Sequence, residues 1–213
     1  MDCFKKVLAT GFAATFCGAA MAAPVAISNH SFENPDVGGA GGWSDANVDW
    51  GDDAGASPEE FTEHIAGFSA DGVNHTGVNT GSLITQDVAA TYTSGMQYTL
   101  TVAIGNRGSQ GTLDEDDAEI RLVDASNGNI LASSIFNTGA LTADDTFTDV
   151  SIVYNAGAGV DGNGIRIELA AIGATAGSRA HYDNVRLDEA IPEPGSLALL
   201  GLGGLTLLRR RRK

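Results

Sequence analysis

Two tryptophans and one arginine are the side chains of this sequence best suited to hold a ligand. Trp43 and Trp50 lie in a stretch rich in glycine and aspartate, outside the regular strands that the rest of the sequence predicts. Sugar rings stack their apolar C–H faces on aromatic surfaces, while polar side chains bind the hydroxyl groups. Arg107 is a suitable donor for such a ligand. The alternatives are that the tryptophans pack into the core and that Arg107 pairs with a carboxylate.

A carboxylate in the last predicted strand needs compensation. Asp183 alternates with Val185 and Leu187, so the pattern points its side chain toward the interior. A buried carboxylate without a partner is costly. We expect that Asp183 either caps a turn or pairs with Arg179 or Arg186; a further alternative follows below from the fold.

Patterns of known catalytic centres are absent from the sequence. It has no Gly-x-Ser-x-Gly, no His-Glu-x-x-His and no phosphate-binding loop. The four histidines are too far apart in the chain for the usual spacing of a metal site: His30, His64, His75 and His181. The acidic run from Asp114 to Asp117 matches no calcium-loop spacing and is interpreted as a solvated loop. We therefore expect a protein that is not an enzyme, although two suitably spaced carboxylates would suffice for a glycosidase.

Strands must position these residues, because apolar and polar residues alternate with a period of two and helical periodicity is nearly absent. The alternation is clearest in residues 96–105. Comparable runs cover residues 83–88, 118–123, 130–136, 147–154, 165–169 and 181–187. Residues 26–32 and one or two strands between 48 and 78 bring the total to about eight to ten strands, with turn signals between them. This pattern predicts an all-β fold, an antiparallel β-sandwich.

Short motifs in these strands resemble galactose-binding-like jelly rolls, a fold shared by many carbohydrate-binding modules. The motifs are Asn-His-Ser-Phe-Glu at 29–33, Ser-Leu-Ile-Thr-Gln at 82–86, Gly-Met-Gln-Tyr-Thr-Leu at 95–100 and Tyr-Asp-Asn-Val-Arg-Leu at 182–187. The resemblance implies a jelly-roll sandwich. It also implies a structural Ca²⁺, which such modules often hold with one carboxylate after the first strand and one in the last. Glu33 and Asp183 occupy those two places, and calcium prefers oxygen ligands.

The N-terminus has the features of a secretory signal peptide. Lys5 and Lys6 precede a small apolar segment that ends in the small-x-small sequence Ala20-Met21-Ala22. We expect signal peptidase to remove residues 1–22, so that the mature chain begins at Ala23. Both cysteines lie within this segment, at positions 3 and 17, and the exported domain therefore has no disulfide.

The C-terminal residues 191–213 combine three elements in a fixed order. Pro192-Glu193-Pro194 is followed by a short apolar run and then by Arg209, Arg210, Arg211, Arg212 and a final lysine. The run from 195 to 208 would span about 21 Å as a helix, against roughly 30 Å for a hydrocarbon core, and the cations favour the cytoplasmic side. This tail resembles the PEP-CTERM sorting signal. The resemblance implies a Gram-negative exported protein that enters the inner membrane transiently before an exosortase-type enzyme removes the tail.

The segment between the two signals, residues 23–190, is long enough for one β-sandwich ectodomain. It contains five basic residues, all arginine, against 25 acidic ones, which gives a net charge of −20. Such a charge repels nucleic acid phosphates and anionic membrane surfaces, and we exclude nucleic acid as a partner. Solubility outside the cell or binding of divalent cations would explain the charge.

Taken together, these features predict an exported protein of the cell surface or extracellular matrix that binds or is embedded in extracellular polysaccharide. Trp43, Trp50 and Arg107 are the candidate ligand-binding residues, and Glu33 and Asp183 the candidate calcium ligands. Two alternatives stay open at this point. One is a small secreted polysaccharide hydrolase, and the other is a structural surface protein without a specific ligand.

Overall fold

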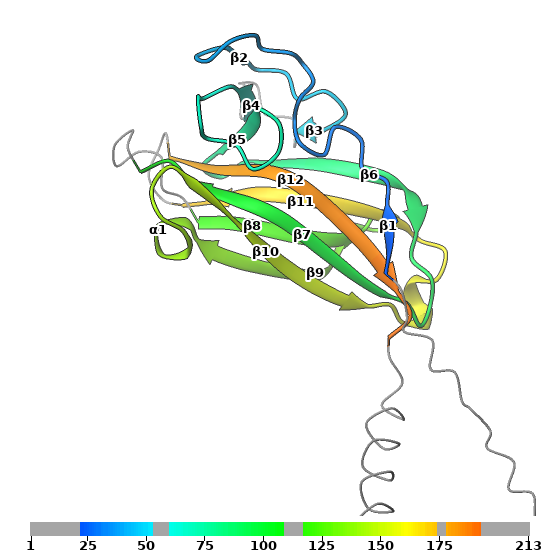
Figure 1. Ribbon diagram of the computed structural model, residues 1–213. Coiled ribbons are helices and arrows are strands. Elements are labelled where there is room, and N and C mark those ends of the chain that lie inside the picture. The colour runs from blue at the N-terminus through cyan, green and yellow to red at the C-terminus, as the bar shows by residue number, and fades with distance from the viewer. Residues whose placement is uncertain (1–21, 53–59, 109–116, 174–177, 193–213) are drawn as a thin grey trace, which may run out of the picture. The chain divides into compact units, whose positions relative to one another are not determined.

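Two antiparallel β-sheets packed face to face make up the part of the chain that the computed structural model describes, residues 22–52, 60–108, 117–173 and 178–192 (Figure 1). The predicted all-β sandwich is confirmed. Outside the described residues lie most of the signal peptide, Asp114 to Asp116, and the tail from Glu193 through Pro194 to Arg209–Arg212. Among the described residues, no helix has the length and apolar character needed to cross a membrane.

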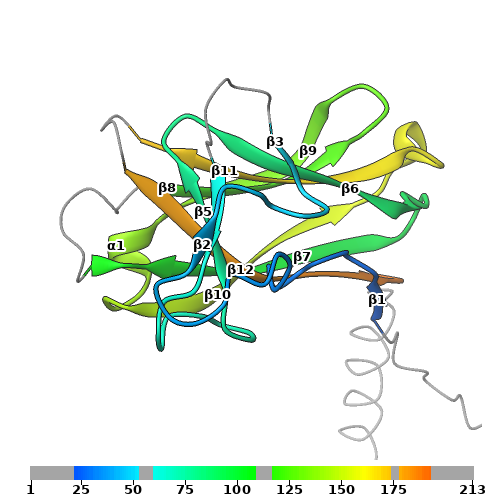
Figure 2. The same ribbon diagram turned by 90° about the horizontal axis from the view of Figure 1, so that it is seen from above.

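The larger sheet, called sheet A, has the strand order β10-β7-β12-β5-β4-β2, with β1 paired to β12. Its strands are β1 (Ala23–Val25), β2 (Trp43–Ser44), β4 (Glu60–Glu63), β5 (His75–Asn79), β7 (Gln97–Asn106), β10 (Thr146–Asn155) and β12 (Arg179–Ala190). The strands β7, β10 and β12 are its three long strands, and β10 forms one edge of the sheet. Three short strands, β5, β4 and β2, extend it on the other side of β12; they lie at the top of Figure 1, the side from which Figure 2 views the molecule.

The smaller sheet, sheet B, has the order β3-β6-β11-β8-β9. Its strands are β3 (Gly51–Asp52), β6 (Leu83–Thr91), β8 (Asp117–Asp124), β9 (Asn129–Asn137) and β11 (Gly164–Ile172). A short helix, α1 (Thr138–Leu141), leads from β9 to β10, and a 3₁₀ turn, η2 (Ala158–Val160), precedes β11. The seven strand runs predicted between residues 83 and 187 correspond to β6 through β12.

The core lies between the two sheets and contains the apolar half of each alternating strand. Leu100 and Ile104 of β7 face Ile120 of β8 and Ile167 of β11, and all four are fully buried. The buried tyrosine hydroxyls in this core are paired. The hydroxyl of Tyr182 donates to the carbonyl oxygens of Glu119 and Ala170 across the sandwich, and those of Tyr92 and Tyr98 also donate to backbone carbonyls. Burial of these rings is therefore compatible with their hydroxyl groups.

Residues 26–32, predicted as a strand, form a turn instead. Asn29 has φ 45° and Phe32 has φ 55°, in the left-handed region that asparagine tolerates better than most residues. The Asn29 amide fixes the turn, since its Nδ2 donates to the carbonyl oxygens of Asn34 at 2.6 Å and Val48 at 2.8 Å. Phe32 nevertheless reaches the core, where it is fully buried. The apolar pattern identified a core residue but not the backbone that positions it.

Candidate functional site

A row of three side chains crosses the outer face of sheet A, the face that points away from sheet B. Trp43 of β2 is the register partner of Glu63 in β4, and Glu63 is the partner of His75 in β5. The row runs from solvent to the interior: Trp43 is 65% exposed, Glu63 is partly buried and His75 is fully buried. An exposed aromatic ring, a carboxylate and an imidazole are thus brought into one line by strand pairing alone.

Glu63 connects the parts of this arrangement, because a guanidinium group and an imidazole ring contact the same oxygen of its carboxylate. Its Oε1 accepts from Nη1 of Arg107 at 2.8 Å and from Nε2 of His75 at 3.1 Å. Arg107 follows the last residue of β7, so the end of a central strand delivers its guanidinium to the same place. The side chains of Glu63 and Arg107 are 12% and 16% exposed, and this pair is therefore much less screened by water than a surface ion pair.

His181 of β12 lies beside this row, and glycines on both neighbouring strands make room around it. Its register partners are Gly77 in β5 and Gly105 in β7. A Cβ atom at Gly77 would lie 2.2 Å from Cζ of Phe61, and one at Gly105 would lie 2.7 Å from Cζ of Phe147. The aromatic rings therefore occupy the space that side chains at these strand positions would need.

The two buried histidines lie next to each other inside an aromatic shell that consists of the rings of Phe61, Phe68 and Phe147. Their ring centroids are 5.2 Å apart, and Phe68 packs edge-on against both rings, at 4.8 Å from His75 and 5.6 Å from His181. Among the residues that the structure describes, neither ring nitrogen of His181 has a hydrogen-bond partner, whereas Nδ1 of His75 lies near the backbone of Phe68 without a hydrogen bond of normal geometry. Buried imidazole nitrogens are usually paired, so the nitrogens of His181 above all need an explanation.

Burial determines the charge state of both rings. Desolvation lowers the pKa of His75, although the hydrogen bond to Glu63 opposes this effect. Desolvation also holds the pKa of His181 well below its ordinary value, and the nearby His75 and Arg107 lower it further. Both imidazoles are therefore neutral at physiological pH, and a neutral imidazole keeps a lone pair available for a proton or a metal ion.

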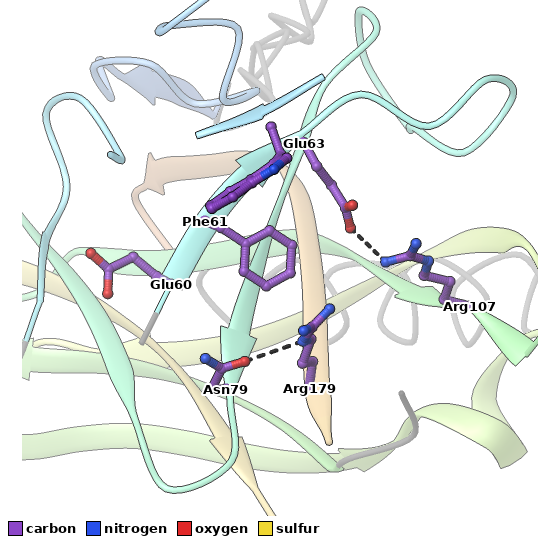
Figure 3. A pocket seen from close by; sticks show the side chains of 7 residues that line it. Glu60, Phe61, Glu63, Asn79, Arg107 and Arg179 are labelled. Atoms are coloured by element: carbon purple, nitrogen blue, oxygen red, sulfur yellow. Dashed lines mark hydrogen bonds and ion pairs between the residues drawn. The ribbon is translucent and has the colours of Figure 1, made fainter. Parts of the chain in front are cut away.

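A pocket of about 380 Å³ opens next to the row, as Figure 3 shows from close by. Its walls come from β2, β4, β5, β12 and the residue after β7: Trp43, Glu60, Phe61, Glu63, Asn79, Arg107 and Arg179. The Arg179 guanidinium lies 4.7 Å above the Phe61 ring and donates from Nε to Asn79 at 3.2 Å. Two carboxylates, two guanidinium groups, an amide and two aromatic rings thus surround a space large enough for a small polar ligand.

Of the three residues predicted to bind a ligand, the structure brings two together. Trp43 and Arg107 both line the pocket, and Arg107 also makes the carboxylate pairing that was its alternative role. Trp50 is placed elsewhere. It is 6% exposed, packs on Phe32 with ring centroids 5.4 Å apart and donates from Nε1 to the Asn29 carbonyl. Trp50 therefore belongs to the core, because its ring completes the packing under the 29–34 turn, and it offers no surface for stacking.

The two predicted calcium ligands contact the same loop, between β4 and β5. Asp183 accepts from the backbone N–H groups of Ala70 at 2.6 Å and Asp71 at 2.9 Å, while Glu33 accepts from Val73 and Asn74, both at 2.8 Å. Of the alternatives for Asp183, the turn cap is therefore present. Desolvation raises its pKa to about 7, although these N–H donors oppose the shift. Calcium binding by the two carboxylates stays a prediction.

Asp183 is buried as expected, but strand alternation is not the reason. The side chains that reach the core beside Val185 and Leu187 include Tyr182, and the register of β12 shifts between Asp183 and Arg186. Asn184 within this shift has φ 47°. Alternation therefore changes phase at the bulge and leaves Asp183 on the outer face, where the loop between β4 and β5 covers it.

The sequence does not reveal the histidine pair, because His75 and His181 are far apart along the chain and lack the usual spacing of a metal site. The structure instead brings ligand atoms of Glu63, His75 and His181 within 4.8 Å of one another. A signal was present in the glycines at 77 and 105, each inside an otherwise regular strand pattern, since such glycines mark a close approach by another group. It indicated crowding at these strands but not which residue was crowded.

Comparisons with known protein families give one match for the ectodomain and one for the C-terminal tail. Residues 23–188 match the family model described as HpiC1 cyclase, HpiC1-like. Residues 190–213 match the model of the PEP-CTERM protein-sorting motif, so the predicted sorting signal is confirmed. No curated protein sequence matches the chain at a significant level.

Several solved structures share the fold. An apo cyclase from Fischerella sp. is 20% identical with a TM-score of 0.68, and the match covers 81% of this chain and 98% of that chain. A cyclase from Fischerella sp. TAU in complex with 4-(1H-indol-3-yl)butan-2-one is 18% identical with a TM-score of 0.66, over 81% and 100% of the two chains. TmCBM61 in complex with β-1,4-galactotriose is 15% identical with a TM-score of 0.52, over 76% and 97%. At these identities the likeness shows the fold, including the predicted resemblance to carbohydrate-binding modules.

Proposed function

The chain belongs to the HpiC1 cyclase-like family and is an exosortase-sorted PEP-CTERM protein, and on this basis we propose that its ligand is a saccharide bound in the pocket beside Trp43. PEP-CTERM proteins are exported and reach the cell surface through exosortase. A ligand met there is extracellular, and extracellular polysaccharide is the abundant one. The proposal therefore joins the destination of the chain to the chemistry of its pocket.

The observation that carries the proposal is the exposure of Trp43. A single exposed apolar residue is common, but this indole lies at the rim of a pocket lined by charged side chains. An indole face open to solvent beside hydrogen-bonding groups is what a sugar ring needs, because its C–H face stacks while its hydroxyl groups are bound at the side. Phe61 is a second aromatic wall of the same pocket.

The charges of the pocket fit a neutral ligand. Arg107 and Arg179 are two of only five basic residues in the ectodomain, and they lie with Glu60 and Glu63 around one space. The pocket is thus locally balanced, although the ectodomain as a whole carries −20. An anionic polymer would be repelled at longer range, whereas a neutral sugar is held by stacking and directional hydrogen bonds.

The test is a titration of the mature exported protein with neutral oligosaccharides of galactose, glucose and xylose, followed by calorimetry and tryptophan fluorescence. Loss of a central aromatic anchor costs more than about 2 kcal/mol, so Trp43→Ala should weaken binding roughly thirtyfold or more. Val153→Ala is the control, since Val153 is 50% exposed on β10, outside the pocket lining. The proposal fails if no saccharide binds or if Trp43→Ala binds as tightly as the wild type. New reducing ends in the mixture would identify a hydrolase instead.

A second candidate is an enzyme that closes or rearranges a ring in a small molecule. The family model is that of a cyclase, which weighs against the expectation of a protein without catalytic activity. The observation in favour is the contact between Glu63 and the neutral His75, because a carboxylate and an imidazole at 3.1 Å can transfer a proton to or from a ligand in the pocket. Binding of 4-(1H-indol-3-yl)butan-2-one in competition with oligosaccharides, and its loss in Glu63→Gln, would favour this candidate over the first.

Removal of the tail is tested separately. If exosortase processes the PEP-CTERM motif, mass spectrometry of the protein recovered from the cell surface should find no peptide that contains Leu208 and Arg209. Replacement of Arg209–Arg212 by serine should leave an unprocessed form, because the positive-inside restraint is gone. A mature surface protein that still carries the arginines would contradict removal of the tail, without bearing on the pocket.

A further inference from the structure

We infer that Glu63, His75 and His181 form a binding site for a divalent first-row transition metal ion, of which Zn²⁺ is the test case. Ligand atoms of the three residues lie within 4.8 Å of one another. They come from β4, β5 and β12, three strands that pair side by side in sheet A. The site is therefore built on hydrogen-bonded strands rather than on loops, so its ligands start near one another before any ion arrives.

The unpaired nitrogens are the first argument. His75 and His181 are both fully buried, yet no residue in the described part of the chain pairs with either nitrogen of His181, and Nδ1 of His75 meets the Phe68 backbone without normal hydrogen-bond geometry. A purely structural histidine in such a place would be expected to pair its N–H and its lone pair. A metal ion bound between the two rings would use one lone pair of each. The observed gap in hydrogen bonding is what such a site presents without its ion.

The aromatic shell is the second argument. The rings of Phe61, Phe68 and Phe147 surround the histidines, and Gly77 and Gly105 leave the space for those rings. An apolar surrounding keeps water away from a site and strengthens the interaction of an ion with its ligands. The same apolar shell would be a poor environment for two polar rings that served only to fill space.

The donor atoms decide the class of metal. Two imidazole nitrogens and one carboxylate oxygen suit zinc and its first-row neighbours, whereas calcium and magnesium prefer oxygen ligands throughout. Three protein ligands leave a position for a further group. Glu63 also lines the pocket, so one ligand of the site contacts the space in which a pocket ligand would bind. This site is distinct from Glu33 and Asp183, whose oxygens are the donors expected for calcium.

Arg107 is the group that opposes a cation here, and its geometry limits the opposition. Its Nη1 donates to Oε1 of Glu63, the oxygen that His75 also contacts. A carboxylate can accept from a guanidinium on one oxygen and coordinate through the other, and the hydrogen bond then orients the ligand. The ectodomain, at −20, attracts cations as a whole.

The experiment uses the mature protein without a histidine tag, freed of metal by a chelator and dialysed against Zn²⁺ or Co²⁺ in the absence of saccharide. We expect about one equivalent of tightly bound metal and a visible Co²⁺ absorption spectrum typical of nitrogen and oxygen ligands in low coordination. His75→Gln, His181→Gln and Glu63→Gln should each weaken binding at least tenfold. His30→Gln, a change at an exposed histidine outside the cluster, should bind like the wild type.

Two outcomes would overturn the site: wild type that binds much less than one equivalent, or cluster variants that retain wild-type affinity. If the histidine variants do not fold, the Co²⁺ spectrum of the wild type and its bleaching by added Zn²⁺ decide the question. Calcium in excess should not displace Co²⁺, and displacement would place the metal at oxygen ligands instead. Saccharide binding measured with chelator present keeps this result separate from that of the proposed function.

Discussion

The two faces of sheet A are made of different chemistry. On the inner face, Leu100, Ile104 and Tyr182 are fully buried, and the one hydroxyl among them donates to backbone carbonyls of sheet B. On the outer face, His75 and His181 are just as deeply buried, but no residue that the structure describes pairs with either ring nitrogen of His181. Depth of burial is thus the same on both faces, whereas satisfaction of polar atoms is not.

The difference separates packing from function. A core contributes stability when its polar atoms are paired, and the buried tyrosine hydroxyls of the inner face meet that condition. Unpaired polar atoms under a shell of rings lower stability unless a ligand or an ion compensates them. The outer face is therefore where this domain gives up stability, and a site that gives up stability is where binding or chemistry is expected.

The tryptophans provide the largest contrast between the two regions. Trp50→Ala should lower the free energy of unfolding by about 3–5 kcal/mol, because it removes a core ring that packs on Phe32. Trp43→Ala should change stability by less than about 0.5 kcal/mol, since the ring is mostly in solvent. Urea denaturation of both variants measures the difference. A large loss in Trp43→Ala would mean that the exposed ring is structural and would remove the basis for a stacking site.

Substitution of Asp183 distinguishes its role as a turn cap from its predicted role as a calcium ligand. Asp183→Ala should lower stability by about 1–3 kcal/mol, because three backbone N–H groups lose their acceptor. The measurement is a melting curve in EGTA and again in calcium at fixed ionic strength. An equal loss in both conditions assigns the effect to the turn. A loss that appears only with calcium makes Asp183 a calcium ligand, as the sequence predicts.

Gly77 tests the space around His181. Gly77→Ala should cost about 1–3 kcal/mol, because its Cβ would lie 2.2 Å from Cζ of Phe61 and the ring must move. Since Phe61 also lines the pocket, the affinity for the saccharide should fall together with the stability. Gly157→Ala is the matched control, because apart from its chain neighbours no residue that the structure describes lies within 4 Å of its Cβ position. Unchanged stability and affinity in Gly77→Ala would show that the shell is loose.

The smallest effect is expected on sheet B, where Asp87 of β6 pairs with Arg166 of β11 at 2.6 Å. The hydrogen bond from Arg166 lowers the pKa of Asp87, so this pair contributes stability above about pH 4 that is lost as the pH falls. Both side chains are partly exposed, and the contribution should stay below about 1 kcal/mol. The stability difference between wild type and Asp87→Asn should shrink from pH 7 to pH 3. A difference that grows on acidification would contradict this assignment.

Local signals in the sequence were sufficient for the architecture. Alternation identified the seven strands from β6 to β12, because the side-chain period of a strand is written directly into the chain. The C-terminal sorting motif was also recognisable from the sequence, because its proline, apolar and arginine elements follow one another along the chain. The strand predicted at 26–32 failed where Asn29 and Phe32 adopt positive φ, a backbone conformation that is stabilised by a hydrogen bond from the Asn29 side chain to the distant Val48 carbonyl.

The candidate site was predictable only in part. Trp43 and Trp50 lie in the same glycine-rich stretch, and nothing local distinguishes the exposed ring from the buried one. What distinguishes them is their tertiary surroundings: Trp43 is paired across to Glu63 at the edge of sheet A, and Trp50 packs on Phe32 under a turn. Arg107 was identified as a candidate, but its partner came from a strand on the other side of β12.

The sequence by itself determined that this chain is exported, that it ends in a sorting motif, and that its middle forms a β-sandwich with a strongly acidic surface. These are properties of contiguous segments and of composition. The tertiary structure alone decided that Glu63, His75 and His181 meet, because strand order and register are set by the summed packing of both sheets and not by any one segment. Residues far apart in the chain become neighbours only when β5 and β12 pair, and the chemistry of the outer face arises from that pairing.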